Sequence, residues 1–138
     1  MNTTVADLRL IDFNLNKSQD GSLVAVESMK DIPIEIRRIF YVYDSDGKNR
    51  GNHAHKETSQ VLVCVSGKIV VTCSDGDSSK SFTLDTPSKG LFIPEMIWDS
   101  VDYCEENTIL LVMSDTKYNR EDYIENFENF KDIKCSLL

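Results

Sequence analysis

Residues 60–73 read QVLVCVSGKIVVTC, and this stretch decides the fold class of the chain. Two apolar runs rich in β-branched residues, 60–65 and 68–73, flank the pair Ser66-Gly67. β-Branched residues favour strands, and a short loop that contains glycine favours a tight turn between antiparallel strands. We therefore predict a β-hairpin in this stretch.

Similar short runs, separated by turn residues, lie on both sides of the predicted hairpin. They span residues 8–13, 22–27, 36–43, 80–84, 90–93, 97–103 and 108–114. About nine or ten short strands with Gly, Pro, Asn, Asp and Ser between them are typical of an antiparallel sandwich or barrel. Only residues 120–131 place apolar side chains at helical spacing. We predict an all-β domain with a short C-terminal α-helix that packs one face on the barrel.

The chain has 138 residues, 41% hydrophobic and 28% charged, which is typical of one globular domain over residues 1–138. Its net charge of −8 argues against binding to nucleic acid or an anionic membrane, because both need a cationic face. No apolar run approaches the roughly 18 residues of a membrane span, and the N-terminus lacks the regions of a signal peptide. The four cysteines contain no C-x-x-C pair, so we expect a reduced, cytoplasmic protein.

The only two histidines, His53 and His55, lie two positions apart in the sequence RGNHAH of residues 50–55. Alternate residues of a β-strand point to the same face, so we predict that both imidazoles project into one space. Such a pair has three interpretations: metal ligands, an acid–base pair, or two structural residues.

A metal site would follow the H-x-H pattern of the metal-binding cupins. Gly67 matches the glycine that ends the first cupin motif, but Gln60 stands where that motif has its ligating glutamate. Asp99 stands where the second motif has its histidine. Imidazole and carboxylate ligands suit iron or zinc, and the donors left for them are His53, His55, Glu57 and Asp99. Because two of four expected ligands are missing, we predict no metal and no other cofactor.

Acid–base catalysis fits the histidine pair better. Histidine has an unperturbed pKa of about 6.5, so it takes and returns a proton near neutral pH. Two adjacent imidazoles disfavour double protonation, which helps to keep one of them as a free base. We predict that His53 and His55 are catalytic.

Arginines near the histidines predict an anionic ligand. Arg37 and Arg38 alternate on the strand predicted at residues 36–43, so one of them faces the barrel interior. A buried guanidinium needs an anion, and a diphosphate fits its planar fork. Arg50 stands just ahead of the histidines, and Trp98 would either stack on a base or sugar or fill the core.

Several segments together resemble a known family. They are IRRIFY at residues 36–41, RGNHAH at 50–55, QVLVC at 60–64, Trp98, and DYI at 122–124. With them the chain resembles, from about residue 7 to 130, the nucleotide-sugar 3,4-ketoisomerases, metal-independent cupins that act on dTDP-4-oxo-6-deoxyglucose. The resemblance implies a cupin jelly-roll barrel, a homodimer that often exchanges N-terminal strands, and a role in deoxysugar biosynthesis. It also implies a dTDP-linked 4-keto-6-deoxy sugar as substrate, whose ketone moves from carbon 4 to carbon 3.

Site residues carry over from the family one by one. His53 matches the proton acceptor, which would remove the proton from carbon 3 and form an enediolate. The proton for carbon 4 would come from His55, from His53 itself or from water. The substrate-binding residues that we predict are Arg50, Arg38, Tyr41, Gln60 and Trp98. One departure is Asp99-Ser100, where family members often have Arg-Glu or His-Glu, which leaves the product's configuration at carbon 4 (galacto or gluco) open.

Two other functions stay open. One is a non-catalytic cupin that binds a nucleotide sugar and associates with a glycan-assembly enzyme. The other is 3,5-epimerisation, which is expected to use a histidine with an aspartate partner and a catalytic tyrosine in a longer chain.

Overall fold

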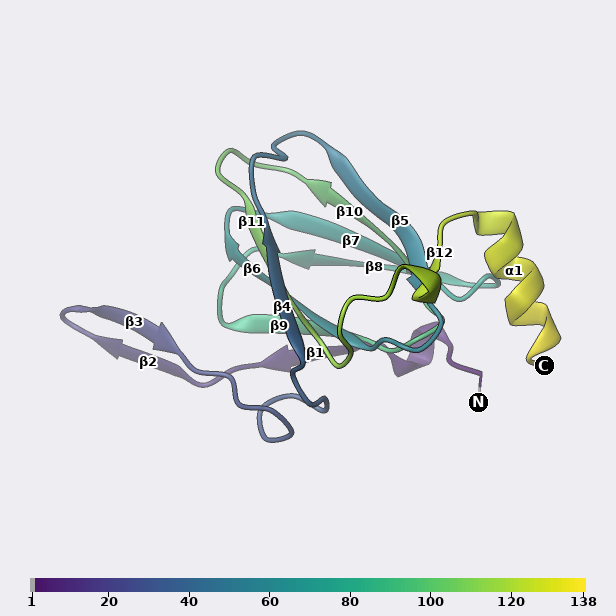
Figure 1. Cartoon of the computed structure of the whole chain (residues 1–138). Helices are drawn as coiled ribbons and strands as arrows, with labels where there is room; N and C mark the ends of the chain where they lie inside the picture. The colour runs from purple at the N-terminus through teal and green to yellow at the C-terminus, as the bar shows by residue number, and fades with distance from the viewer. Residues whose placement is uncertain (1) are drawn as a thin grey trace.

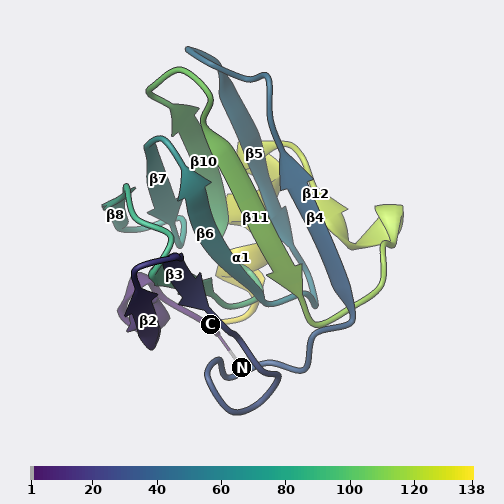
Figure 2. The same ribbon diagram turned by 90° about the vertical axis from the view of Figure 1, so that its left-hand side faces the viewer.

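Two antiparallel five-stranded sheets, packed face to face, form the body of the protein (Figures 1 and 2). The structure is a computed structural model that describes residues 2–138. The first sheet has the order β1 (Arg9–Asp12), β9 (Lys89–Ile93), β6 (Gln60–Ser66), β11 (Ile109–Ser114) and β4 (Arg38–Val42). The second has the order β12 (Tyr123–Ile124), β5 (Asn49–His55), β10 (Trp98–Tyr103), β7 (Ile69–Ser74) and β8 (Ser79–Leu84). The remaining elements are η1 (Val5–Asp7), β2 (Leu15–Ser18), β3 (Gly21–Val24), η2 (Arg120–Asp122) and α1 (Phe127–Ser136).

The main core lies between the two sheets. Burial alternates along β7, where every second residue is buried, because successive side chains of a strand point to opposite faces. Leu62 of β6, Val71 of β7 and Val112 of β11 are among the apolar side chains that meet there. The prediction of an all-β jelly roll with a C-terminal helix is therefore confirmed.

The predicted hairpin at residues 60–73 is wrong. β6 pairs with β9 and β11, whereas β7 pairs with β10 and β8 in the other sheet. The Ser66-Gly67 turn therefore carries the chain across the core from one sheet to the other. Gly67 has a φ of +79°, and a Cβ there would lie 2.3 Å from Thr108 Oγ1, so this corner needs glycine.

The C-terminal helix begins later than its predicted range of 120–131. Asn126 caps α1 by accepting a hydrogen bond from the backbone N–H of Asn129, and the helix then continues to Ser136. Residues 120–124 instead form η2 and β12, and β12 pairs with β5, with Tyr123 opposite His55. α1 packs on the outer face of the second sheet, where Phe130 and Ala54 belong to one buried cluster. Within residues 2–138, no helix has the length and apolarity needed to cross a membrane.

The hairpin of β2 and β3 extends away from the two sheets (Figure 1). Leu15 and Leu23 on this hairpin are 42% and 58% exposed. Every residue of the two strands except Val24 is exposed, so the hairpin buries little surface within its own chain.

Candidate active site

A cavity of about 110 Å³ lies between the sheets. Its wall is apolar on the side of β4 and β11, where Phe40, Val42, Leu110 and Val112 contribute. Its polar lining residues are Arg50, His53, Gln60, Asp99 and Tyr103. The polar groups therefore gather on β5 and β10, with Gln60 reaching in from the opposite sheet.

A β-bulge in β5 turns both Arg50 and His53 toward the cavity. Residues three apart on a regular strand point to opposite faces, but Asp99 pairs with His53 and Ser100 with Gly51, which leaves Asn52 unpaired. Gly51 has a φ of +86°, and a Cβ there would lie 3.0 Å from Asp99 Oδ1. The glycine of the RGNHAH segment is thus required by the close approach of β10.

The two histidine side chains lie side by side, as predicted. Their ring centroids are 5.2 Å apart and the rings are nearly perpendicular, at 83°. Tyr123 of β12 packs against both rings, with centroid distances of 5.2 Å to His53 and 4.4 Å to His55. Ala54, between them in sequence, points the other way, into the cluster under α1. The three rings therefore form one contiguous group, of which His53 lines the cavity.

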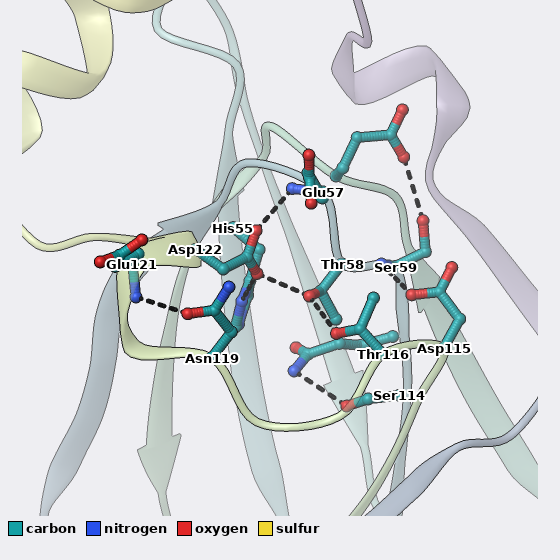
Figure 3. Close-up of polar contacts among 12 residues, drawn as sticks. His55, Glu57, Thr58, Ser59, Ser114, Asp115, Thr116, Asn119, Glu121 and Asp122 are labelled. Carbon is teal, nitrogen blue, oxygen red and sulfur yellow. Dashed lines mark hydrogen bonds and ion pairs between the residues drawn. The ribbon is translucent and has the colours of Figure 1, made fainter.

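His55 is held by a buried aspartate (Figure 3). Its Nδ1 lies 2.8 Å from Asp122 Oδ2, and Asp122 also accepts hydrogen bonds from Thr58 Oγ1 at 2.6 Å and from the Glu57 backbone N–H at 2.7 Å. An ionised carboxylate only accepts hydrogen bonds, so this contact assigns the proton of neutral His55 to Nδ1. His55 Nε2 then carries a lone pair, and it is a buried nitrogen that has no hydrogen-bond partner among residues 2–138.

The charges of this pair follow from its surroundings. Burial raises the pKa of Asp122, but the hydrogen bonds from Thr58, His55 and the Glu57 backbone outweigh burial and leave the pKa below its ordinary value. Burial also lowers the pKa of His55 more than Asp122 raises it. At neutral pH the pair is therefore an ionised carboxylate and a neutral imidazole with a basic Nε2.

His53 has a different carboxylate neighbour. Asp99 lies opposite it on β10 and is 5% exposed. Burial raises the pKa of Asp99 to about 6, and the charge of His53 opposes this rise. Burial likewise lowers the pKa of His53, and the charge of Asp99 opposes that shift. The site thus contains two His–Asp pairs: the pKa of Asp122 lies below its ordinary value, whereas the pKa of Asp99 lies above it.

Three of the predicted substrate-binding residues lie at or beside the cavity. Arg50 and Gln60 line it, and the Gln60 amide donates a hydrogen bond to Ser114 Oγ at 3.4 Å. Arg38 lies beside it, with its guanidinium 4.6 Å from the ring centroid of Phe40 and 5.1 Å from that of Tyr118. Among residues 2–138, no carboxylate forms a salt bridge with Arg38. Arg38 therefore remains available to an anion.

The other two predicted substrate-binding residues, Tyr41 and Trp98, lie away from this cavity. Tyr41 is 64% exposed on the outer face of the first sheet, stacked on Tyr43. Trp98 points outward from β10 and packs against Phe127 and Phe130 of α1. Neither residue lines the cavity, because each alternates with an inward-facing neighbour on its strand.

The donors considered for a metal do not converge. Glu57 is exposed, and its backbone rather than its side chain contacts Asp122. Within residues 2–138, no group of three or more His, Cys, Asp or Glu side chains is placed to hold a metal ion.

Sequence reasoning missed Asp122 and Thr58 as site residues. Asp122 was noted only as the first residue of the DYI segment, and no sequence pattern marked Thr58 as a site residue. A short apolar pair directly after an aspartate, Tyr123-Ile124, was the available hint of a further strand beside the histidines.

A jelly roll with a histidine pair, one member of which lines the inner cavity, defines the class of cupin-like proteins. Within that class, residues 6–135 match the family model described as "FdtA: WxcM-like, C-terminal". Because the match covers nearly the whole chain, this protein belongs to that family.

Relatives of the chain are sugar 3,4-ketoisomerases. The TDP-4-oxo-6-deoxy-alpha-D-glucose-3,4-oxoisomerase of Aneurinibacillus thermoaerophilus is 37% identical over 124 residues, 89% of each chain. The crystal structure of a 3,4-ketoisomerase from Helicobacter canadensis has a TM-score of 0.91 at 36% identity and covers 94% of this chain and 98% of that one. A histidine-to-asparagine mutant of the 3,4-ketoisomerase QdtA from Thermoanaerobacterium thermosaccharolyticum, in complex with TDP-4-keto-6-deoxyglucose, has a TM-score of 0.90 at 31% identity, covering 96% of both chains.

Proposed function

We propose that this protein is a nucleotide-sugar 3,4-ketoisomerase that converts dTDP-4-oxo-6-deoxyglucose to the 3-oxo-6-deoxy sugar. The observation that carries the proposal is the histidine pair: His53 lines the cavity, and the neighbouring His55 is fixed so that a basic nitrogen remains free. The family and the activity named for its relatives supply the substrate class.

The reaction moves two protons, and each histidine transfers one of them. His53 takes the proton from carbon 3 as the carbon–hydrogen bond breaks and its electron pair enters an enediolate with carbon 4. Return of that proton to carbon 4 leaves the ketone on carbon 3. The hydroxyl proton on oxygen 3 must also reach oxygen 4, and His55 Nε2, a neutral acceptor, is suited to carry it. Hydrogen only moves within the substrate, so the reaction needs no redox partner.

The diphosphate of the substrate binds at Arg38 and Arg50. Arg38 has aromatic neighbours but no carboxylate among residues 2–138, and its charge acts on the pKa of His55. Arg50 lines the cavity on the same strand as the histidines. A guanidinium forms paired hydrogen bonds with phosphate oxygens, so these residues would place the sugar next to the imidazoles.

The test is the product itself. On incubation with dTDP-4-oxo-6-deoxyglucose, NMR is expected to show the ketone at carbon 3 and exchange of the carbon-bound proton in deuterated water. The same activity is expected after exhaustive chelation, since the proposed steps use only imidazoles. Tight binding of the dTDP sugar without proton exchange would instead identify a non-catalytic binding protein.

Epimerisation has one observation in its favour. The His55–Asp122 contact and the adjacent Tyr123 provide the histidine, aspartate and tyrosine that we expected of a 3,5-epimerase. The family match and the relatives at 31–37% identity favour the ketoisomerase. In the NMR experiment, exchange at carbon 5 would reveal the epimerase.

A homodimer forms part of the proposal. The β2–β3 hairpin extends from the body (Figure 1). Leu15 and Leu23 on the hairpin are exposed, as are Ile39 and Tyr41 on the outer face of β4. A second copy with its own arm and sheet face would cover both apolar surfaces. The four cysteines are free, which supports a reducing compartment such as the cytoplasm.

Leu23→Glu is expected to convert the dimer to a monomer, because a charge would then be buried against the partner. Light scattering coupled to size-exclusion chromatography measures the mass directly. Ser22→Glu, on the neighbouring exposed position of the same strand, is the matched control and is expected to remain dimeric. A monomeric wild type, or a dimeric Leu23→Glu variant, would contradict the proposed assembly.

A further inference from the structure

Asp99 is a buried carboxylate without the partners that normally accompany one. Its side chain lines the cavity, and its Cα pairs with that of His53 across β5 and β10. Asp122, by contrast, accepts three hydrogen bonds. Among residues 2–138, the Asp99 carboxylate has neither a hydrogen bond nor a salt bridge that would stabilise its charge, and His53 is the group whose charge does so. Burying such a carboxylate without donors is costly, and perturbed carboxylates of this kind are typical of functional sites.

We propose that Asp99 is a positioning residue for His53, whose carboxylate stabilises the imidazolium that forms when His53 takes the proton from carbon 3. The proposal rests on the proposed function of the site. As the carbon–hydrogen bond breaks, a nitrogen–hydrogen bond forms on His53 and the ring becomes positive beside a negative neighbour. The proton does not pass to Asp99 but remains on His53 until it is delivered to carbon 4. The favourable charge pair therefore exists in the enediolate state and not before it.

None of the other groups described around Asp99 carries a negative charge that could stabilise the imidazolium of His53. On β5, Arg50 also lines the cavity, but His53 is the group whose charge lowers the pKa of Asp99. On β7, Cys73 is paired with Asp99, and burial raises the pKa of its thiol, so it stays neutral. Tyr103 on β10 is also neutral, because burial raises its pKa to about 12. Gln60, from β6, carries no charge.

The two His–Asp pairs therefore have different roles, because their surroundings differ. Asp122 is surrounded by donors and stays ionised, which fixes the tautomer of His55, while burial keeps the His55 imidazole neutral by lowering its pKa. Asp99 has no such donors, so its interaction with His53 strengthens as the imidazole becomes charged. In the first pair the carboxylate fixes the tautomer of its histidine, and in the second the carboxylate stabilises the charge that forms on the base.

The experiment is an NMR titration of the two imidazoles in wild type and in Asp99→Asn. The chain contains only two histidines, so both signals can be assigned with a His55→Gln variant. Without the carboxylate, the titration midpoint of His53 is expected to move to lower pH, while that of His55 stays in place. The acid limb of the kcat–pH profile is expected to move in the same direction, and kcat at neutral pH to fall about tenfold, because a weaker base removes the proton more slowly.

Asp102→Asn on the same strand is the matched control. Its carboxylate faces away from the cavity and accepts a hydrogen bond from Asn49, so neither midpoint nor kcat should change. An unshifted His53 midpoint in folded Asp99→Asn, or in Asp99→Ser if the first variant does not fold, would overturn the proposal. The titration needs no substrate, so it tests the Asp99–His53 couple even if the wild type proves not to be an isomerase.

Discussion

His53→Asn is expected to lower the rate of isomerisation by about 10²–10⁴-fold, the usual contribution of a positioned general base. Asparagine keeps a similar size and polarity but has no nitrogen that can take a proton at neutral pH. His53 is the imidazole that lines the cavity, so the loss should fall on kcat rather than on substrate binding. NMR of the conversion gives the rate, and calorimetric titration with the dTDP sugar gives the affinity.

The control for this variant is Lys56→Ala, which alters an exposed side chain one residue beyond the pair. It should keep the wild-type rate. If His53→Asn also kept that rate, His53 would not be the base, and His55 would become the candidate.

Asp122→Asn is expected to reduce kcat by a similar factor, about 10²–10⁴-fold, because it disturbs the tautomer of His55. Three donors point at the Asp122 carboxylate: the His55 ring, the Thr58 hydroxyl and the Glu57 backbone. An asparagine amide presents one acceptor and one donor to them, so at least one of these contacts becomes repulsive. The imidazole nitrogen chemical shifts report the tautomer, independently of the rate.

The same substitution is expected to destabilise the fold by about 1–3 kcal/mol, the range for a buried hydrogen-bonding group that loses its partner. The pKa of Asp122 in the folded state lies below its ordinary value, so its stabilisation is present at neutral pH and is lost as the pH falls through that pKa. Urea unfolding should therefore separate wild type from variant at pH 7 and bring them together in acid. Glu121→Gln, an exposed neighbour, should change neither stability nor rate; a wild-type rate and tautomer in Asp122→Asn would remove this aspartate from the mechanism.

The positions of most strands could be predicted from the sequence because strand formation depends on local features. Apolar alternation and turn residues identified the β-rich body and the late helix. The same period of two placed His53 and His55 on one face, and the structure brings their rings within 5.2 Å. Arg38 was identified as one of two arginines that alternate on a strand, although the pattern did not say which of the two would face the interior.

Tertiary structure decided how these elements were joined. The Ser66-Gly67 turn has the residues of a hairpin, but its strands belong to different sheets. A local pattern encodes the turn and the strands, while pairing depends on partners such as β9 and β10 that come much later in the chain. For the same reason Tyr123 and Ile124, read as part of a helix, became an edge strand beside β5.

By itself, the sequence determined an all-β fold, a histidine pair on one face and an arginine suited to an anion, because each depends on residues that are close along the chain. Only the tertiary structure decided that Asp122, 67 positions away, holds His55, and that Asp99 faces His53 across two strands. It also excluded Tyr41 and Trp98 from the cavity. Hydrogen bonds, burial and the resulting protonation states are set by neighbours in space, and the pairing of distant strands is what makes those residues neighbours.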